Sequence, residues 1–148
     1  MELKIRKAII DDLETIQGIA CRTIDMNYRP FLGDKGVDRF IESGAAHKYL
    51  QDNIVDCWLI ENEDKMLGFC VCKGDLLDLM MVETAFHGKG YGSKLLKHVE
   101  TIMFSDFEEI KLESFERNEE ANNFYSNHGW VQSEKRFDKA SNVFKLIF

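Results

Sequence analysis

Three closely spaced glycines, Gly88, Gly90 and Gly92, lie between an apolar run that ends at Val82 and a helical pattern that begins at Ser93. A strand that enters a helix through such glycines leaves backbone N–H groups unpaired, and these groups bind phosphate oxygens with help from the helix dipole. The spacing differs from the G-x-G-x-x-G of dinucleotide-binding folds and the G-x-x-x-x-G-K-[ST] of P-loops. We therefore predict a diphosphate-binding loop of another class; the alternative is a glycine-rich loop that binds nothing.

A second stretch with side chains capable of chemistry lies between Leu112 and Trp130. Glu113 falls in a strand-like run, Asn118 precedes a short helical pattern, and Tyr125 lies within that pattern. Residue type alone leaves two interpretations of each. Glu113 is a catalytic base or a strand carboxylate paired with a nearby basic residue. Asn118 is a ligand contact or a helix N-cap, and Tyr125 is a general acid or a core tyrosine.

Hydrophobic periodicity predicts the elements that position these residues. Strands are expected near Leu3 and Ile5 and at residues 57–60, 66–73, 76–82, 110–115, 132–137 and 143–148. Helices are expected after Asp11, where Glu14 completes a capping box, from Ser93 onward, and at residues 119–126. The order is strand, helices, three strands, helix, strand, helix, two strands. It predicts a mixed α/β sheet with right-handed crossovers in its middle.

The region between the first helix and the strand at residues 57–60 has the weakest pattern. Pro30 lies within residues 28–36, where we expect the first helix to end in a loop. Short helices are expected on both sides of Ser43, which is a candidate cap for the second of them. Further on, polar residues 61–65 should join two strands into a hairpin.

Both stretches resemble motifs of one family. The run from His87 to Gly92, HGKGYG, is similar to the acetyl-CoA motif [QR]-x-x-G-x-[GA] of the GNAT superfamily of N-acetyltransferases, with His87 in place of Gln or Arg. The second stretch resembles the family's later motif, a strand carboxylate followed by an Asn, a short helix, and a Tyr before a Gly and an aromatic residue. The matching residues are Glu113, Asn118, Tyr125, Gly129 and Trp130. With the opening strand and helix, the resemblance covers the chain except for its middle loops.

The resemblance implies a fold and an activity. The fold would be a mixed, mostly antiparallel sheet of about seven strands with flanking helices, whose fourth and fifth strands are parallel and splayed. Residues 1–148 would form a single acetyltransferase domain. The activity would be transfer of an acetyl group from acetyl-CoA, as cosubstrate and without a metal, to a primary amine by direct attack in a ternary complex.

The resemblance also implies roles for particular residues. Tyr125 would protonate the departing CoA thiolate, and Glu113 or a water relay would take the proton of the amine. Main-chain groups of the splayed fourth strand would bind the pantetheine arm and the acetyl carbonyl. The implied cofactor-binding residues are Met80, Met81, Val82, His87, Gly88, Lys89, Gly90, Tyr91, Gly92 and Asn118.

Other residues have two open interpretations. Lys89 and Lys94 contact CoA phosphates or are solvated surface lysines. Aromatic residues after the first helix and in the second strand, Tyr28, Phe31 and Trp58, are candidates for the wall of the acceptor site, with core packing as the alternative for Trp58. His128 precedes Gly129 at an expected helix C-terminus, where a capping role is favoured.

Composition limits the class of protein. The chain has 148 residues, 45% of them hydrophobic, which suits one domain with one core. The net charge is -7, so we expect no nucleic-acid partner and a surface that favours cationic substrates such as amines. No apolar run approaches the ~18 residues of a membrane span, and no signal peptide is expected.

The four cysteines, Cys21, Cys57, Cys70 and Cys72, include no C-x-x-C pair, so neither a zinc site nor a disulfide framework is expected. Reduced thiols favour a cytoplasmic protein. The acceptor, a small-molecule or protein amine, stays open. The resemblance also allows a homodimer, since many relatives pair through their C-terminal strands. The alternative function is a non-catalytic acyl-CoA-binding module or sensor.

Overall fold

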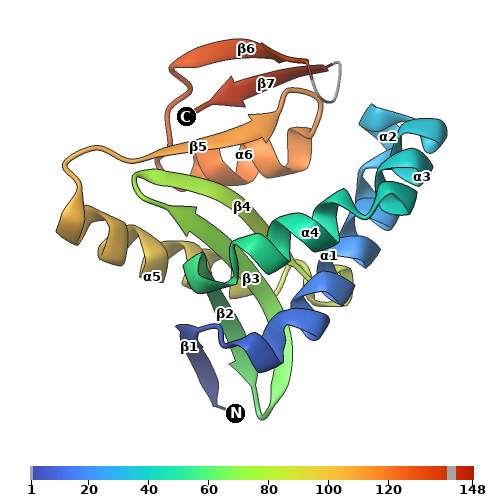
Figure 1. Ribbon diagram of the computed structural model, residues 1–148. Helices are drawn as coiled ribbons and strands as arrows, with labels where there is room; N and C mark the ends of the chain where they lie inside the picture. The colour runs from blue at the N-terminus through green and yellow to red at the C-terminus, as the bar shows by residue number, and fades with distance from the viewer. Residues whose placement is uncertain (1, 140–142) are drawn as a thin grey trace.

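The computed structural model describes residues 2–139 and 143–148, and its central feature is one seven-stranded sheet (Figure 1). The strand order is β1-β2-β3-β4-β5-β7-β6, and only β4 and β5 pair in parallel. The expected mixed, mostly antiparallel sheet is therefore confirmed. The strands are β1 (Leu3–Lys7), β2 (Cys57–Asn62), β3 (Lys65–Lys73), β4 (Leu76–Val82), β5 (Lys111–Phe115), β6 (Glu134–Asp138) and β7 (Val143–Ile147).

Helices cover both faces of the sheet (Figure 1). One face carries α1 (Leu13–Asn27), α2 (Arg29–Leu32), α3 (Asp34–Ser43) and α4 (Ala45–Asp52), and the other carries α5 (Tyr91–Asp106) and α6 (Glu119–Asn127). Each face has its own apolar core. The central strand β3 is buried from Leu67 to Val71 because helices cover both of its faces. Strands of this kind have continuous apolar sequences rather than alternating ones. No helix within the described residues is long and apolar enough to span a membrane.

The hairpin of β2 and β3 forms as expected, with a register shift between Ile60 and Glu61. Its turn contains Glu63 and Asp64, which both have positive φ, at 49° and 70°. Two successive positive φ values are typical of the type I′ turn, whose twist matches that of the flanking strands. β3 pairs in turn with β4 along its other edge, so the hairpin supports the position of β4.

Two local expectations were wrong. Residues 28–36 do not form only a loop, because Pro30 lies in the first turn of the short helix α2. Proline is tolerated there since the first N–H groups of a helix have no intrahelical acceptor. The expected capping box of Asp11 and Glu14 does not form: a 3-10 turn (Ile10–Asp12) precedes α1, and Asp12 Oδ2 caps that turn by accepting a hydrogen bond from the Ile9 N–H at 2.8 Å.

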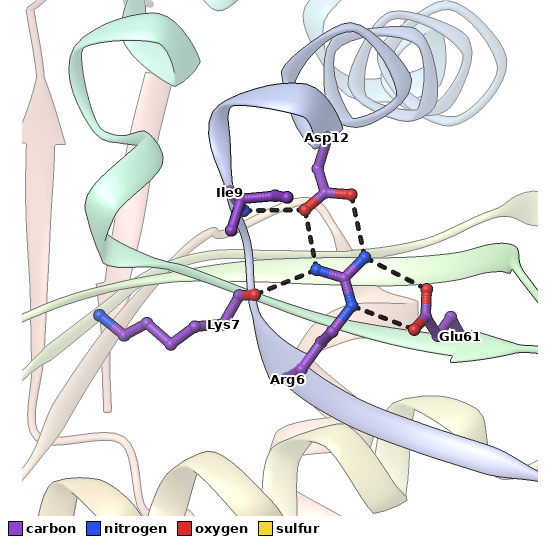
Figure 2. A network of polar contacts seen from close by, with 5 residues as sticks. All are labelled: Arg6, Lys7, Ile9, Asp12 and Glu61. Atoms are coloured by element: carbon purple, nitrogen blue, oxygen red, sulfur yellow. Dashed lines mark hydrogen bonds and ion pairs between the residues drawn. The ribbon is translucent and has the colours of Figure 1, made fainter.

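Asp12 also belongs to a network centred on Arg6 (Figure 2). The Arg6 guanidinium donates to both oxygens of Asp12, at 2.9 and 3.0 Å, and to both oxygens of Glu61, at 3.0 and 3.3 Å. A fifth bond goes to the Lys7 carbonyl. The guanidinium lowers the pKa of the Asp12 carboxyl. The network ties the start of α1 to the edge of the sheet formed by β1 and β2.

Gly68 of β3 lies against β4 with no room for a side chain. A Cβ at this position would lie 2.7 Å from the Met81 carbonyl oxygen and 3.1 Å from the Val82 Cα. These backbone atoms cannot move unless β4 moves. We expect Gly68→Ala to lower the free energy of unfolding by about 1–3 kcal/mol, the usual cost of overpacking, as measured by urea denaturation.

Gly36→Ala in α3 is the matched control. Its Cβ would meet only the Leu32 Cβ, at 3.8 Å, and alanine favours a helix over glycine by about 1 kcal/mol. Its stability should equal or exceed that of the wild type. An equal loss of stability in both variants would contradict the steric argument for Gly68.

Candidate active site

A pocket of about 420 Å³ opens where β4 and β5 separate. Its wall is formed by the second half of β4, the glycine loop with the start of α5, the first two turns of α6, and the C-terminal part of α1. Because α1 lies on one face of the sheet and α5 and α6 on the other, this pocket reaches both faces. It is the place in the described structure where most of the candidate residues meet.

The separation of the strands follows from their pairing. β4 and β5 share only two pairs, Leu76 with Lys111 and Leu77 with Leu112. Beyond them β5 pairs with β7, starting at Glu113, while β4 continues to Val82 beside β3. Among the described residues, the second half of β4 therefore has no partner strand on its β5 side. The expected splay of parallel strands is confirmed, and Met80, Met81 and Val82 line the pocket at this point.

A bulge in β4 marks the same point. Val71 of β3 pairs with Leu79 and the next residue, Cys72, pairs with Leu77, so Asp78 is the extra residue of β4. Bulges of this kind bend a strand and increase its twist. The Asp78 carboxylate accepts a hydrogen bond from the Tyr49 hydroxyl of α4, which fixes the bulge to the helical layer.

The glycine loop is open to the pocket. Gly88 and Gly90 have φ values of +76° and +83°, which side chains rarely adopt, and a Cβ at either would meet no atom within 4 Å. Among the described residues, no acceptor bonds the N–H groups of Gly88, Lys89 and Gly90. The first N–H groups of α5 follow directly and have no intrahelical acceptor. The loop thus presents consecutive free donors, an arrangement that suits an anion.

Gly92 has a different role from the other two glycines. Its Cβ would lie 3.4 Å from the Phe124 ring and 3.6 Å from Val82 Cγ2. The absence of a side chain lets α6 pack closely against the start of α5.

His87 anchors the loop to the end of β4. Its Nε2 lies 2.7 Å from the Val82 carbonyl oxygen, so Nε2–H is the donor. Its Nδ1 faces Glu120 Oε1 of α6 at 3.9 Å. The side chain at the position of the usual Gln or Arg therefore holds the turn and also forms part of the pocket wall.

Asn118 caps α6. Its Oδ1 accepts a hydrogen bond from the Ala121 N–H at 3.4 Å, which is the N-cap role expected from the sequence. Asn118 also lines the pocket. Among the described residues its side-chain amide nitrogen has no acceptor, so it remains available to a ligand.

Tyr125 lies in the wall of the pocket, 8% exposed, with its ring against Phe124, Trp130 and Phe148. The core interpretation is confirmed by this packing, and because the residue also borders the pocket, the general-acid role stays a prediction. Its hydroxyl has no hydrogen-bond partner among the described residues. Burial raises the pKa of Tyr125, so the phenol keeps its proton at neutral pH. It can donate that proton to a more basic group in the pocket.

Tyr28, at the end of α1, lines the same pocket. Its ring packs against Phe31 and Phe115, with centroids 5.0 and 5.8 Å away. Burial raises the pKa of Tyr28 to about 12. Phe31 supports this wall from behind without lining the pocket, whereas Trp58 lies elsewhere, against His98 and Lys7.

Glu113 is the candidate that the structure does not bring into the pocket wall. It is the first residue of β5 beyond the pairing with β4, and its Oε1 lies 3.9 Å from Arg136 Nη1 of β6. Within the described residues, neither Lys111 nor Arg117, the nearby basic residues in sequence, pairs with Glu113. Arg117 instead donates a hydrogen bond to the Pro30 carbonyl at 3.3 Å. Glu113 is therefore paired across the sheet with β6 rather than placed in the pocket wall.

Three further features were missed by sequence reasoning or only partly expected. Thr23 and Asn27 line the pocket from α1, although nothing in their spacing distinguishes them from other helix residues. His128 caps α6 as expected, with Nδ1–H donating to the Phe124 carbonyl at 2.7 Å, but its Nε2 also lies 2.7 Å from Ser93 Oγ of α5.

Among the described residues, no group of three or more His, Cys, Asp or Glu side chains could hold a metal ion.

A family model described as an acetyltransferase (GNAT) domain matches residues 53–132 of this chain. No curated protein matches the chain in sequence. Among solved structures, the chain is similar to the PaiA N-acetyltransferase of Thermoplasma acidophilum in complex with coenzyme A, with 20% identity, 99% and 98% of the two chains covered, and a TM-score of 0.80.

Two other structures are similar over nearly the whole chain. The apo form of YjaB from Escherichia coli has 22% identity, 99% and 96% coverage of this chain and its own, and a TM-score of 0.78. A GCN5-related N-acetyltransferase from Rhodopseudomonas palustris has 12% identity, 99% and 94% coverage, and a TM-score of 0.84. At these identities the likeness establishes the fold.

Proposed function

The chain belongs to the GNAT acetyltransferase family, and on this premise we propose that it transfers an acetyl group from acetyl-CoA to a primary amine. One observation carries the proposal: a single pocket joins the free amides of the glycine loop, the unpaired side of β4 and the buried phenol of Tyr125. These are the three elements needed to hold a diphosphate, align a thioester and protonate a thiolate.

The residues of the chain divide the binding of acetyl-CoA between them. Amides from Gly88 to the start of α5 bind the diphosphate, with Lys89 beside them. The main chain of Met80, Met81 and Val82 binds the pantetheine arm, and the free side-chain nitrogen of Asn118 adds a donor. The PaiA structure, which contains coenzyme A on a similar fold, supports coenzyme A as the ligand.

The chemistry proposed here is direct attack. The amine nitrogen bonds to the thioester carbonyl carbon, a main-chain N–H of β4 donates to the developing oxyanion, and Tyr125 gives its proton to the sulfur as the C–S bond breaks. Cys70 and Cys72 lie outside the pocket wall, with their sulfur atoms 3.9 Å apart. Their position supports a reaction without an acyl-cysteine intermediate.

The attacking amine must first lose a proton, because amines of the lysine type have pKa values of ~10.4. We propose Glu113 as the base, acting through water at the point where β4 and β5 separate. Its placement as the first residue of β5 beyond the shared pairs supports this role. Because Glu113 lies outside the pocket wall, the proposal requires a water molecule to carry the proton between the amine and the carboxylate.

We also propose the class of acceptor, the cellular location and the domain organisation of the enzyme. The acceptor is a small-molecule or protein amine rather than nucleic acid, in keeping with the net charge of -7. A cytoplasmic location is supported by four free cysteines. One seven-stranded sheet, with β1 and β6 at its edges, supports a single domain.

The direct test is release of free thiol from acetyl-CoA in the presence of a panel of primary amines. Amine-dependent release, with acetylated amine identified by mass, is expected. Tight binding of acetyl-CoA without release for any amine would instead support an acyl-CoA-binding module. Absence of binding would contradict both.

Gly90→Glu should abolish binding of CoA. The carboxylate would occupy the open space in front of the free amides and repel phosphate oxygens, so we expect the dissociation constant to rise more than about 100-fold. Isothermal titration with CoA measures this change.

Two controls separate charge from backbone strain. Gly90→Ala imposes the same positive φ on a side chain without the charge, and should weaken binding far less than Gly90→Glu. Gly36→Glu adds the same charge on α3, outside the pocket wall, and should leave binding unchanged. Unaltered affinity in Gly90→Glu would remove the diphosphate assignment.

Tyr125→Phe should lower kcat by about 100-fold or more, the usual effect of losing a general acid. Acetyl-CoA affinity should stay near that of the wild type, since the ring keeps its packing. Ser105→Ala, which removes a hydroxyl on the exposed side of α5, outside the pocket wall, is the control and should keep its kcat. Full activity of Tyr125→Phe would exclude the acid role.

Glu113→Gln should lower kcat by about 100-fold or more, the usual effect of losing a general base. Glu116→Gln is the control: it removes the same charge from a residue that pairs with Lys135, and it should keep its kcat. Full activity of Glu113→Gln would assign the base to another group.

A further inference from the structure

Thr23 on α1 carries a buried hydroxyl without a partner. The residue is 6% exposed, and its Oγ1 has no hydrogen bond within the described structure. A threonine inside a helix usually bonds the carbonyl three or four residues earlier, and Thr23 does not. A buried polar group without a partner lowers stability, so such a group calls for a functional explanation.

Thr23 belongs to the wall of the site already described, although its hydroxyl oxygen is buried. It lines the pocket together with Asn27 and Tyr28. Asn27 is not free, because its amide donates to Thr84 Oγ1 at 3.0 Å. Thr23 therefore carries an uncommitted hydrogen-bonding group on the α1 side, and a rotation about its Cα–Cβ bond to another staggered rotamer would turn this hydroxyl toward the pocket.

The location of α1 decides which substrate this hydroxyl serves. The glycine loop, Asn118 and Tyr125 approach the pocket from the face of α5 and α6, and they account for the diphosphate, the pantetheine arm and the leaving sulfur. Thr23 approaches from the opposite face, where Met81 packs into the core under α1. A group on that face meets the acetyl carbonyl from the side opposite to the phenol.

We propose that Thr23 is a positioning residue for the acceptor, and that its Oγ1 accepts an N–H hydrogen bond from the attacking amine. This inference rests on the proposed function. With one N–H held, the lone pair of the nitrogen is free to bond the thioester carbon. The bond also fixes the direction of attack.

The same contact selects for primary amines. A primary amine that attacks the thioester loses one proton to the base and keeps one N–H in the product amide, so the bond to Thr23 persists throughout. A secondary amine has a single N–H, which the reaction must remove, and Oγ1 would lose its partner in the transition state. Thr23 thus disfavours N-methylated forms of a good substrate.

The test compares Thr23→Val, which keeps the shape and removes the hydroxyl, with Thr23→Ser, which keeps the hydroxyl. The substrates are the best primary amine of the panel and its N-methyl derivative. For Thr23→Val we expect KM for the primary amine to rise about 3- to 10-fold, the worth of one hydrogen bond, with a smaller preference over the N-methyl derivative. KM for acetyl-CoA should not change, and Thr23→Ser should restore the preference.

A structural role makes different predictions. If Thr23 only supported the fold, Thr23→Val would lower the melting temperature; we expect an equal or higher value, because the variant removes a buried unpaired hydroxyl. Thr23→Ala carries the same kinetic expectation in case valine prevents folding. An unchanged amine KM and an unchanged preference would overturn the role of Thr23 alone. A wild-type protein that acetylates no amine would overturn the proposed function and this inference with it.

Discussion

The site depends on how soon β4 and β5 stop pairing. Only two residue pairs join them before β5 turns to β7. A parallel pair that continued to Val82 would satisfy the main chain of β4 and close the sheet. Because the pairing ends early, the second half of β4 has backbone groups without a partner strand on its β5 side. In the middle of a domain such groups are otherwise satisfied. The pocket connects the two faces of the sheet for the same reason.

Local signals explain what could be predicted from the sequence. Gly88 and Gly90 adopt positive φ, and Asn118 caps a helix, because these properties depend on residues within one turn. The sheet followed from periodicity and the family resemblance. The partners of His128 and Glu113, and the unpaired hydroxyl of Thr23, could not be predicted, since they are set by packing between distant segments. Ser93 lies 35 residues from His128, and Arg136 reaches Glu113 only because β7 places β6 nearby.

The two sides of the pocket use different chemistry. On the α5 side, most donors are main-chain amides, which depend on backbone conformation more than on side-chain identity. On the α1 side, the contacts come from the side chains of Thr23 and Tyr28. Substitution therefore alters the α1 side more readily than the α5 side. This difference fits a fold that is shared with other structures at 12–22% identity.

The fastening of α1 at both ends affects the thermodynamics of recognition. Arg6 and Asp12 hold its start, while Arg22 with Glu83, and Asn27 with Thr84, hold its last turns. A wall fixed in this way loses its conformational entropy during folding rather than when a ligand arrives. A ligand that contacts α1 therefore meets a surface that is already ordered, and its affinity is not reduced by the cost of ordering this wall.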